Sequence, residues 1–170
     1  MQNHTRSETS ARTSEVAGKY LTFALGNEEY GVEILKVREI IGLMPITAVP
    51  RVPDYVKGVV NLRGKVIPVI DLRLKFAMDE AEHTEQTCII VVDVGEVEIG
   101  VIVDRVSEVV DIPADDIESG DSFGSLHADF ILGLGKTGGT VTILLDITRV
   151  LQGEDQVAEA VAAPAPAVAE

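Results

Sequence analysis

The sequence repeats one order of apolar and glycine positions, and this repeat limits the folds that the chain can adopt. At a shift of 69 residues, the copies match at residues 21–26 with 90–95, Glu29 with Glu98, Gly31 with Gly100, Val32 with Val101, Val37 with Val106 and Glu39 with Glu108. At a shift of 75 residues, Gly58, Gly64, Val66 and Asp71 meet Gly133, Gly139, Val141 and Asp146. The chain therefore contains two similar halves, at about residues 18–78 and 79–151.

Each copy has the local pattern of short strands joined by tight turns. Leu21, Phe23 and Leu25 alternate on one face, and a turn at residues 26–27 separates them from the next apolar run. Aromatic residues make up only 4% of the chain and Trp is missing, so the core depends on Val, Ile and Leu. The first two are β-branched and favour strands. We therefore expect an all-β fold with short helices, in which two small barrels pack together.

Each half is expected to end in a hairpin followed by a short helix. Asp71 and Asp146 stand at the helix starts, where a carboxylate accepts from free backbone N–H groups. Pro68 lacks an N–H donor, which predicts an edge or bulged strand there. Halves of 60–70 residues have marginal cores, so we expect them to pack against each other and to leave a groove that is a candidate ligand site.

Composition changes at both ends predict tails outside the folded region. Residues 1–17 are rich in Ser, Thr, Arg and Glu, and residues 152–170 form an acidic segment rich in Ala and Pro. Residues 18–78 carry nine basic and six acidic residues, whereas residues 79–151 carry three and sixteen. This division can orient partners, although solubility alone also explains it.

The net charge of −14 excludes several classes of partner. It repels phosphate backbones and anionic headgroups, so nucleic acid and membrane surfaces are poor candidates. Cys88 is the single cysteine and cannot form an internal disulfide, which favours a reducing cytoplasm. The apolar runs are far shorter than the ~20 residues of a membrane helix, and residues 1–15 lack the apolar core of a signal peptide.

The sequence offers little support for catalysis or for a metal site. The three histidines, His4, His83 and His127, are scattered, and no Cys or His pair has metal-ligand spacing. The acidic residues at 115, 116, 118 and 121 lack the spacing of a calcium loop and are interpreted as a solvated loop. We therefore expect neither an enzyme nor a cofactor.

One glycine-rich motif suggests nucleotide binding as an alternative. Gly133-Leu-Gly-Lys-Thr-Gly-Gly139 resembles the end of a phosphate-binding loop. However, Phe130 stands where that loop needs its first glycine, and residues 141–145 resemble a strand where a helix must follow. The repeat aligns the motif with residues 61–64 and predicts a hairpin turn instead.

The aligned turns differ in their side chains, which points to a specialised role for the first. The first turn carries Asn61 and Arg63, where the second has Lys136, Thr137 and Gly138. An exposed arginine can bind a carboxylate and anchor an interface, or can simply be a solvated turn residue. Glu39 is likewise either an exposed strand residue or the acidic partner of a basic group across an interface.

Four segments together resemble one known family. They are Gly26-Asn-Glu-Glu-Tyr-Gly31, Ile34-Leu-Lys-Val-Arg-Glu-Ile40, Lys57-Gly-Val-Val-Asn-Leu-Arg-Gly64 and Pro68-Val-Ile-Asp-Leu-Arg73. In this order and spacing they closely resemble the CheW family of chemotaxis coupling proteins, and the resemblance spans about residues 19–151. It is weaker over residues 79–151, which match by pattern more than by motif.

The resemblance implies two SH3-like five-stranded β-barrel subdomains and a non-catalytic adaptor without a cofactor. The adaptor would join the cytoplasmic tips of methyl-accepting chemoreceptors to the regulatory domain of the histidine kinase CheA, with other CheW-like domains as further partners in arrays. It would act in the cytoplasm, at membrane-associated receptors. The motifs imply partner-binding roles for Val37, Glu39, Gly58, Asn61 and Arg63, without dividing them between kinase and receptor. A generic adaptor that binds no receptor is the other alternative.

Overall fold

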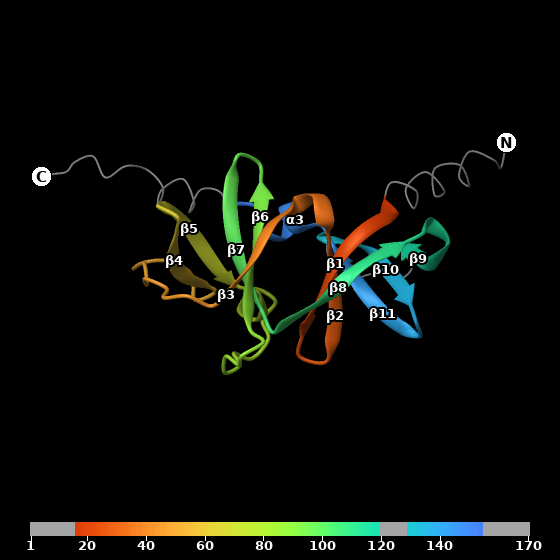
Figure 1. Ribbon diagram of the computed structural model, residues 1–170, viewed down its shortest axis with the longest axis horizontal. Coiled ribbons are helices and arrows are strands. Elements are labelled where there is room, and N and C mark those ends of the chain that lie inside the picture. The colour runs from red at the N-terminus through yellow and green to blue at the C-terminus, as the bar shows by residue number, and fades with distance from the viewer. Residues whose placement is uncertain (1–15, 120–128, 155–170) are drawn as a thin grey trace, which may run out of the picture. The chain divides into compact units, whose positions relative to one another are not determined.

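The computed structural model describes residues 16–119 and 129–154, which form two compact units of strands (Figure 1). Unit 1 comprises the described residues up to Leu35 together with those from Val106 to Val150. Unit 2 comprises Lys36–Arg105 and the described residues from Leu151 onward. The two predicted tails lie almost entirely outside the described residues.

Unit 1 is built on a six-stranded sheet in the order β8-β1-β2-β11-β10-β9. Its strands are β1 (Gly18–Leu25), β2 (Glu28–Glu33), β8 (Arg105–Ile112), β9 (Ile117–Ser119), β10 (Ile131–Thr137) and β11 (Thr140–Leu145). β1 and β2 form one hairpin and β10 and β11 another, and the two hairpins meet where β11 runs parallel to β2. The side-chain hydroxyl of Thr22 on β1 donates to the backbone oxygen of Glu108 on β8 at 2.9 Å.

Unit 2 is built on a five-stranded sheet in the order β3-β6-β7-β5-β4. Its strands are β3 (Val37–Gly42), β4 (Val56–Leu62), β5 (Lys65–Asp71), β6 (Cys88–Val94) and β7 (Val97–Val103). Two hairpins again meet through one parallel pair, here β5 with β7 (Figure 1). The two outer strands, β3 and β4, contribute Ile41 and Leu62 to the same core cluster, so the sheet curves around one core.

The sequence repeat explains why the two sheets have the same strand order. Under the repeat, β6, β7, β8, β10 and β11 correspond to β1, β2, β3, β4 and β5. Replacing each strand of β3-β6-β7-β5-β4 by its counterpart gives β8-β1-β2-β11-β10, which is unit 1 without β9. Each unit therefore combines strands from both halves of the sequence, and the halves 18–78 and 79–151 do not coincide with the compact units.

The core of each unit consists mainly of aliphatic side chains that alternate along the strands. The unit 2 cluster contains Val60, Ile67, Val69, Ile89, Val91 and Ile102, and the unit 1 cluster contains Tyr20, Ile112, Ile117 and Leu144. This confirms the expected all-β fold. Unit 2 has the expected five strands, and the short β9 adds a sixth to unit 1.

Short helices follow the last hairpin of each repeat, as the sequence predicts. They are α2 (Leu72–Lys75) and α3 (Ile147–Val150), and 3-10 turns occur at η1 (Ile34–Lys36) and η2 (Ala114–Asp116). The Asp71 carboxylate accepts from the backbone N–H of Leu74 at 3.3 Å, and the Asp146 carboxylate accepts from that of Arg149 at 3.2 Å. Both aspartates are therefore helix caps.

Candidate protein-interaction site

All five residues that the family motifs mark for partner binding lie in unit 2. Val37 and Glu39 are on β3, Gly58 and Asn61 are on β4, and Arg63 is in the turn between β4 and β5. β3 and β4 are the outer strands of the sheet order. Because the sheet curves, the turn after β4 comes close to β3, and the side chain of Arg63 reaches Glu39.

Arg63 and Glu39 form an ion pair within the chain. Nη2 of Arg63 donates to Oε2 of Glu39, and the two side chains are 69% and 32% exposed. This hydrogen bond is the main reason that the pKa of Arg63 is raised above its ordinary value. Exposed pairs of this kind add little to stability, so the contact mainly orients the guanidinium.

The turn before β5 holds Arg63 in an unusual backbone conformation. Arg63 and Gly64 have φ angles of 53° and 84°, the pattern of a type I′ hairpin turn. The equivalent turn of the second copy has φ angles of 54° and 83° at Gly138 and Gly139. The left-handed region is costly for a residue with a Cβ atom. The turn of the first copy therefore has backbone strain at Arg63 that the glycine turn of the second copy does not have. The residue at this strained position carries an exposed guanidinium.

Asn61 and Gly58 each support the backbone arrangement around β4. Oδ1 of Asn61 accepts from the backbone N–H of Gly64 at 2.8 Å and so supports the turn. Gly58 has a φ angle of 139°, and a Cβ atom there would lie 2.0 Å from the backbone oxygen of Thr47. That approach belongs to a bridge in which Thr47 and Val59 exchange backbone hydrogen bonds of 2.8 and 2.9 Å. Their contacts with partners remain a prediction.

A bulge in β3 sets the direction of its side chains. The register with β6 pairs Val37 with Val92 and Glu39 with Val91, so Arg38 is the extra residue. Val37 and Glu39 are half-buried, whereas Arg38 is exposed. The strand therefore presents a cation beside the two predicted binding residues.

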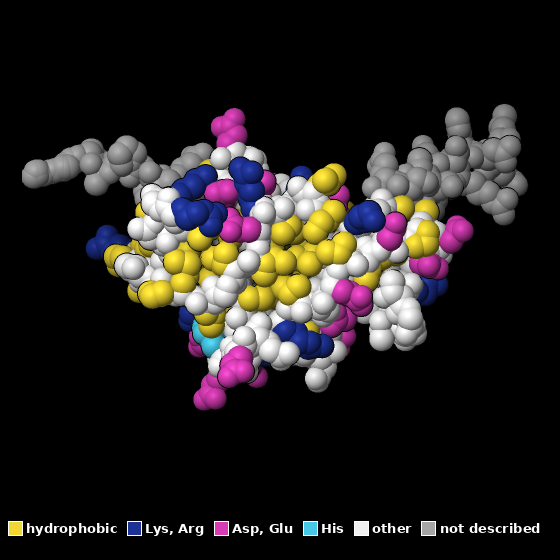
Figure 2. Space-filling view, viewed as in Figure 1, with side chains coloured by type: hydrophobic (Ala, Val, Ile, Leu, Met, Phe, Trp, Pro, Cys, Tyr) yellow, Lys and Arg dark blue, Asp and Glu magenta, His cyan; other side chains and the backbone are white. Residues whose placement is uncertain are grey.

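Glu98 on β7, which lies outside the four segments that resemble the family motifs, connects further charged residues to this region. Its Oε2 accepts from Nε of Arg38 and its Oε1 pairs with Nζ of Lys65, both at 2.9 Å. Nε of Arg38 is also 3.3 Å from Oδ1 of Asp93. The hydrogen bond from Lys65 has the largest effect on the pKa of Glu98 and lowers it. Burial acts in the opposite direction, and the hydrogen bond from Arg38 lowers the pKa further. Figure 2 shows Lys and Arg side chains interleaved with Asp and Glu side chains over β5, β6 and β7.

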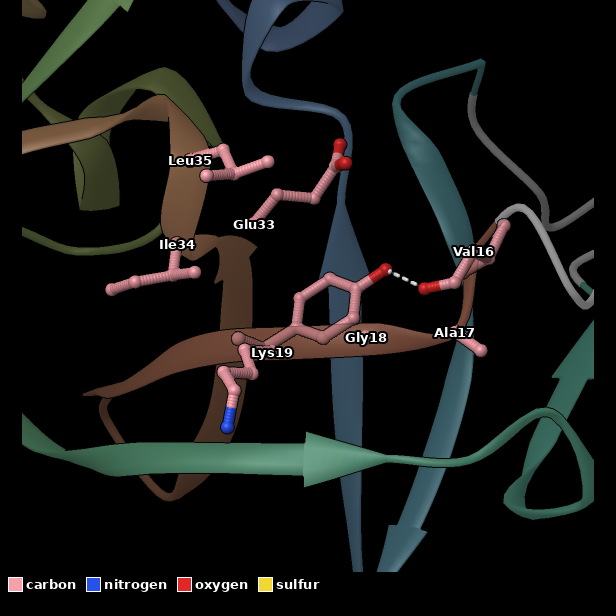
Figure 3. A pocket seen from close by; sticks show the side chains of 8 residues that line it. Val16, Ala17, Gly18, Lys19, Glu33, Ile34 and Leu35 are labelled. Carbon is pink, nitrogen blue, oxygen red and sulfur yellow. Dashed lines mark hydrogen bonds between the residues drawn. The ribbon is translucent and has the colours of Figure 1, made fainter.

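Unit 1 contains a separate pocket of about 360 Å³ (Figure 3). Val16 to Tyr20 line one side and Glu33 to Leu35 the other. The hydroxyl of Tyr20 donates to the backbone oxygen of Val16 at 2.5 Å, and burial is the main cause of the raised pKa of Tyr20. None of the predicted binding residues lines this pocket.

The glycine-rich motif of the second half forms a hairpin. Gly138 and Gly139 make the turn between β10 and β11, and β11 occupies the place where a phosphate-binding loop needs a helix. Within residues 16–119 and 129–154, no group of three or more His, Cys, Asp or Glu side chains is arranged to hold a metal ion. No helix in the same ranges is long and apolar enough to cross a membrane.

Comparisons with known proteins agree with this architecture. The family model of the CheW-like domain matches residues 19–155. A chemotaxis protein CheW from Klebsiella aerogenes is 42% identical over 151 residues, which are 85% of this chain and 91% of that protein. A chemotaxis protein CheW from Treponema pallidum is 31% identical, with 79% of this chain and 82% of that protein covered. The solved structure of the scaffolding protein TtCheW from Thermoanaerobacter tengcongensis superimposes with a TM-score of 0.74 at 32% identity, over 80% of this chain and 93% of that one.

The fold and these matches identify a non-catalytic scaffold protein of bacterial chemotaxis. Such a protein interacts with other chemotaxis signalling proteins. The chain belongs to the CheW family.

Proposed function

We propose that this protein couples the cytoplasmic tips of methyl-accepting chemoreceptors to the regulatory domain of the histidine kinase CheA. Membership of the CheW family supports this coupling. The observation that carries it here is the Arg63–Glu39 pair, in which a strained turn orients an exposed guanidinium beside β3. Arginine is enriched among the residues that dominate binding energy at interfaces.

In this proposal, Val37 supplies half-buried apolar surface and Arg63 and Glu39 supply directional charge. A partner helix would bury apolar side chains against β3 and form ion pairs at its rim. Because the side chains of Arg63 and Glu39 are 69% and 32% exposed, a partner can reach both of them without unfolding the sheet. The protein would work in the cytoplasm, beside receptors that are anchored in the membrane.

The test is a pull-down of the full chain with purified kinase and with a receptor cytoplasmic fragment, each alone and together. Wild type should bind both, and Arg63→Ala should bind at least one of them about tenfold more weakly. Arg51→Ala is the matched control, because Arg51 is also an exposed arginine of unit 2, with a similar φ angle of 62°. This control should leave binding unchanged.

The outcomes separate the possible roles of the turn. Loss of one partner only would assign Arg63 to that interface. If wild type binds neither partner, the coupling proposal fails. If Arg63→Ala and Arg51→Ala both bind like wild type, the family membership stands but the assignment of Arg63 is wrong.

A further inference from the structure

The charged cluster of unit 2 is layered, with cations outside and carboxylates beneath. The side chains of Arg38, Lys65 and Arg63 are 56%, 61% and 69% exposed. Their partners Glu98, Glu39 and Asp93 are only 14%, 32% and 41% exposed. Although the cluster contains equal numbers of positive and negative groups, its solvent-facing layer is therefore mainly cationic.

This layering leaves donors available to a bound group. The ion pairs of the described residues engage Nε of Arg38 and Nη2 of Arg63, and each guanidinium has further N–H groups. Glu98 accepts from both Arg38 and Lys65, so one carboxylate holds two cations in place. Cations held in this way lose less side-chain entropy when a carboxylate binds them.

The surroundings specify the partner further. The chain as a whole carries a net charge of −14, so most of its surface repels an acidic partner and this layer is an exception. The partner chemistry that this layer suits is therefore an acidic segment.

We propose that this cation-fronted surface, formed by Arg38, Arg63 and Lys65, binds an acidic segment of a partner protein. The proposal rests on the proposed function in that it treats the same face of unit 2 as an interaction surface. It adds the chemistry of the partner and assigns binding roles to Arg38 and Lys65 and a positioning role to Glu98.

The experiment uses two synthetic helical peptides with identical leucine positions, one carrying glutamate and the other lysine at the remaining sites. The full chain is labelled with ¹⁵N and titrated with each peptide. We expect the glutamate peptide to bind and to shift the amide signals of β3 and of the turn before β5. Binding should weaken as salt is raised, because exposed charges are screened within about 10 Å at 0.1 M ionic strength.

Variants then test the assigned residues. Arg38→Ala and Lys65→Ala should each weaken binding of the glutamate peptide about two- to fivefold, the range of exposed ion pairs. Lys136→Ala is the matched control, because Lys136 in unit 1 is 54% exposed and is paired with Glu118 at 2.9 Å. It should bind the peptide like wild type.

Three results would overturn the inference: no binding of the glutamate peptide, signal shifts elsewhere in the chain, or equal binding of the lysine peptide at this surface. A loss of stability in the variants without a loss of binding would also overturn it, since the cations would then serve only the fold. The peptides contain neither kinase nor receptor. Their binding can therefore succeed or fail independently of the coupling proposal.

Discussion

Replacing Gly58 by alanine tests the link between the motif of β4 and the fold of unit 2. The new Cβ atom would lie 2.0 Å from the backbone oxygen of Thr47 and 2.7 Å from its carbonyl carbon. Neither atom belongs to a flexible side chain, so the backbone must move. That movement breaks the two hydrogen bonds between Thr47 and Val59.

The expected loss of stability follows from these contacts. A residue with a Cβ atom at a φ angle of 139° costs about 1–3 kcal/mol. Each lost backbone hydrogen bond adds about 1 kcal/mol. With two such hydrogen bonds lost, Gly58→Ala should lower the free energy of unfolding by about 3–5 kcal/mol. With a urea m-value of about 2 kcal/mol/M, the unfolding midpoint falls by about 1.5–2.5 M.

Urea unfolding followed by far-ultraviolet circular dichroism measures this change, since the chain has no Trp for fluorescence. Gly42→Ala is the control, because Gly42 is also on a strand of unit 2 and nothing lies within 4 Å of its Cβ position. The control should change stability by no more than about 0.5 kcal/mol. If Gly58→Ala is as stable as this control, the steric reasoning is refuted, and Gly58 would have to act through a partner.

Two further predictions concern carboxylates of unit 2. Asp71→Ala removes the cap of α2 and should lower the free energy of unfolding, measured in urea, by about 1 kcal/mol. Asp71→Asn keeps an acceptor for the backbone N–H of Leu74 and should lower it less. Equal losses of stability in the two variants would exclude capping as the cause. The lowered pKa of Glu98 means that its stabilising effect is complete above its ordinary value of 4.5 and is lost as pH falls through the lowered pKa. The stability difference between wild type and Glu98→Gln should thus be largest near pH 7 and shrink below pH 4.5, and a difference that grows on acidification would contradict the ion pairs described for Glu98.

The local parts of the fold could be predicted from the sequence because they depend on neighbouring residues. Alternating apolar residues, turn glycines and the capping aspartates identified the hairpins and the two short helices. The expectation for Pro68 was less accurate. Its strand β5 lies between β7 and β4, and the irregularity is in the partner strand between Val56 and Gly58. The parallel register with β7 starts only at Val69, so Pro68 needs no N–H donor toward that strand.

The pairing of strands from different halves could not be predicted, because nothing local distinguishes it. The two copies have the same apolar pattern, so β2 could pair with β5 of its own half or with β11 of the other. The charge network has the same difficulty. Arg38 and Glu98 are 60 residues apart in the chain and meet only because β3 and β7 both flank β6.

The same limit applies to the Arg63–Glu39 pair. The sequence marks both residues as candidates for charge pairing across an interface, whereas here they pair with each other. These two arrangements are compatible. An exposed internal pair contributes little to folding, so a partner can exchange it for intermolecular pairs at small cost. Until then the pair holds the guanidinium in one orientation, which reduces the entropy lost on binding. The strained turn and the ion pair therefore serve the same end, which is to prepare Arg63 for a partner.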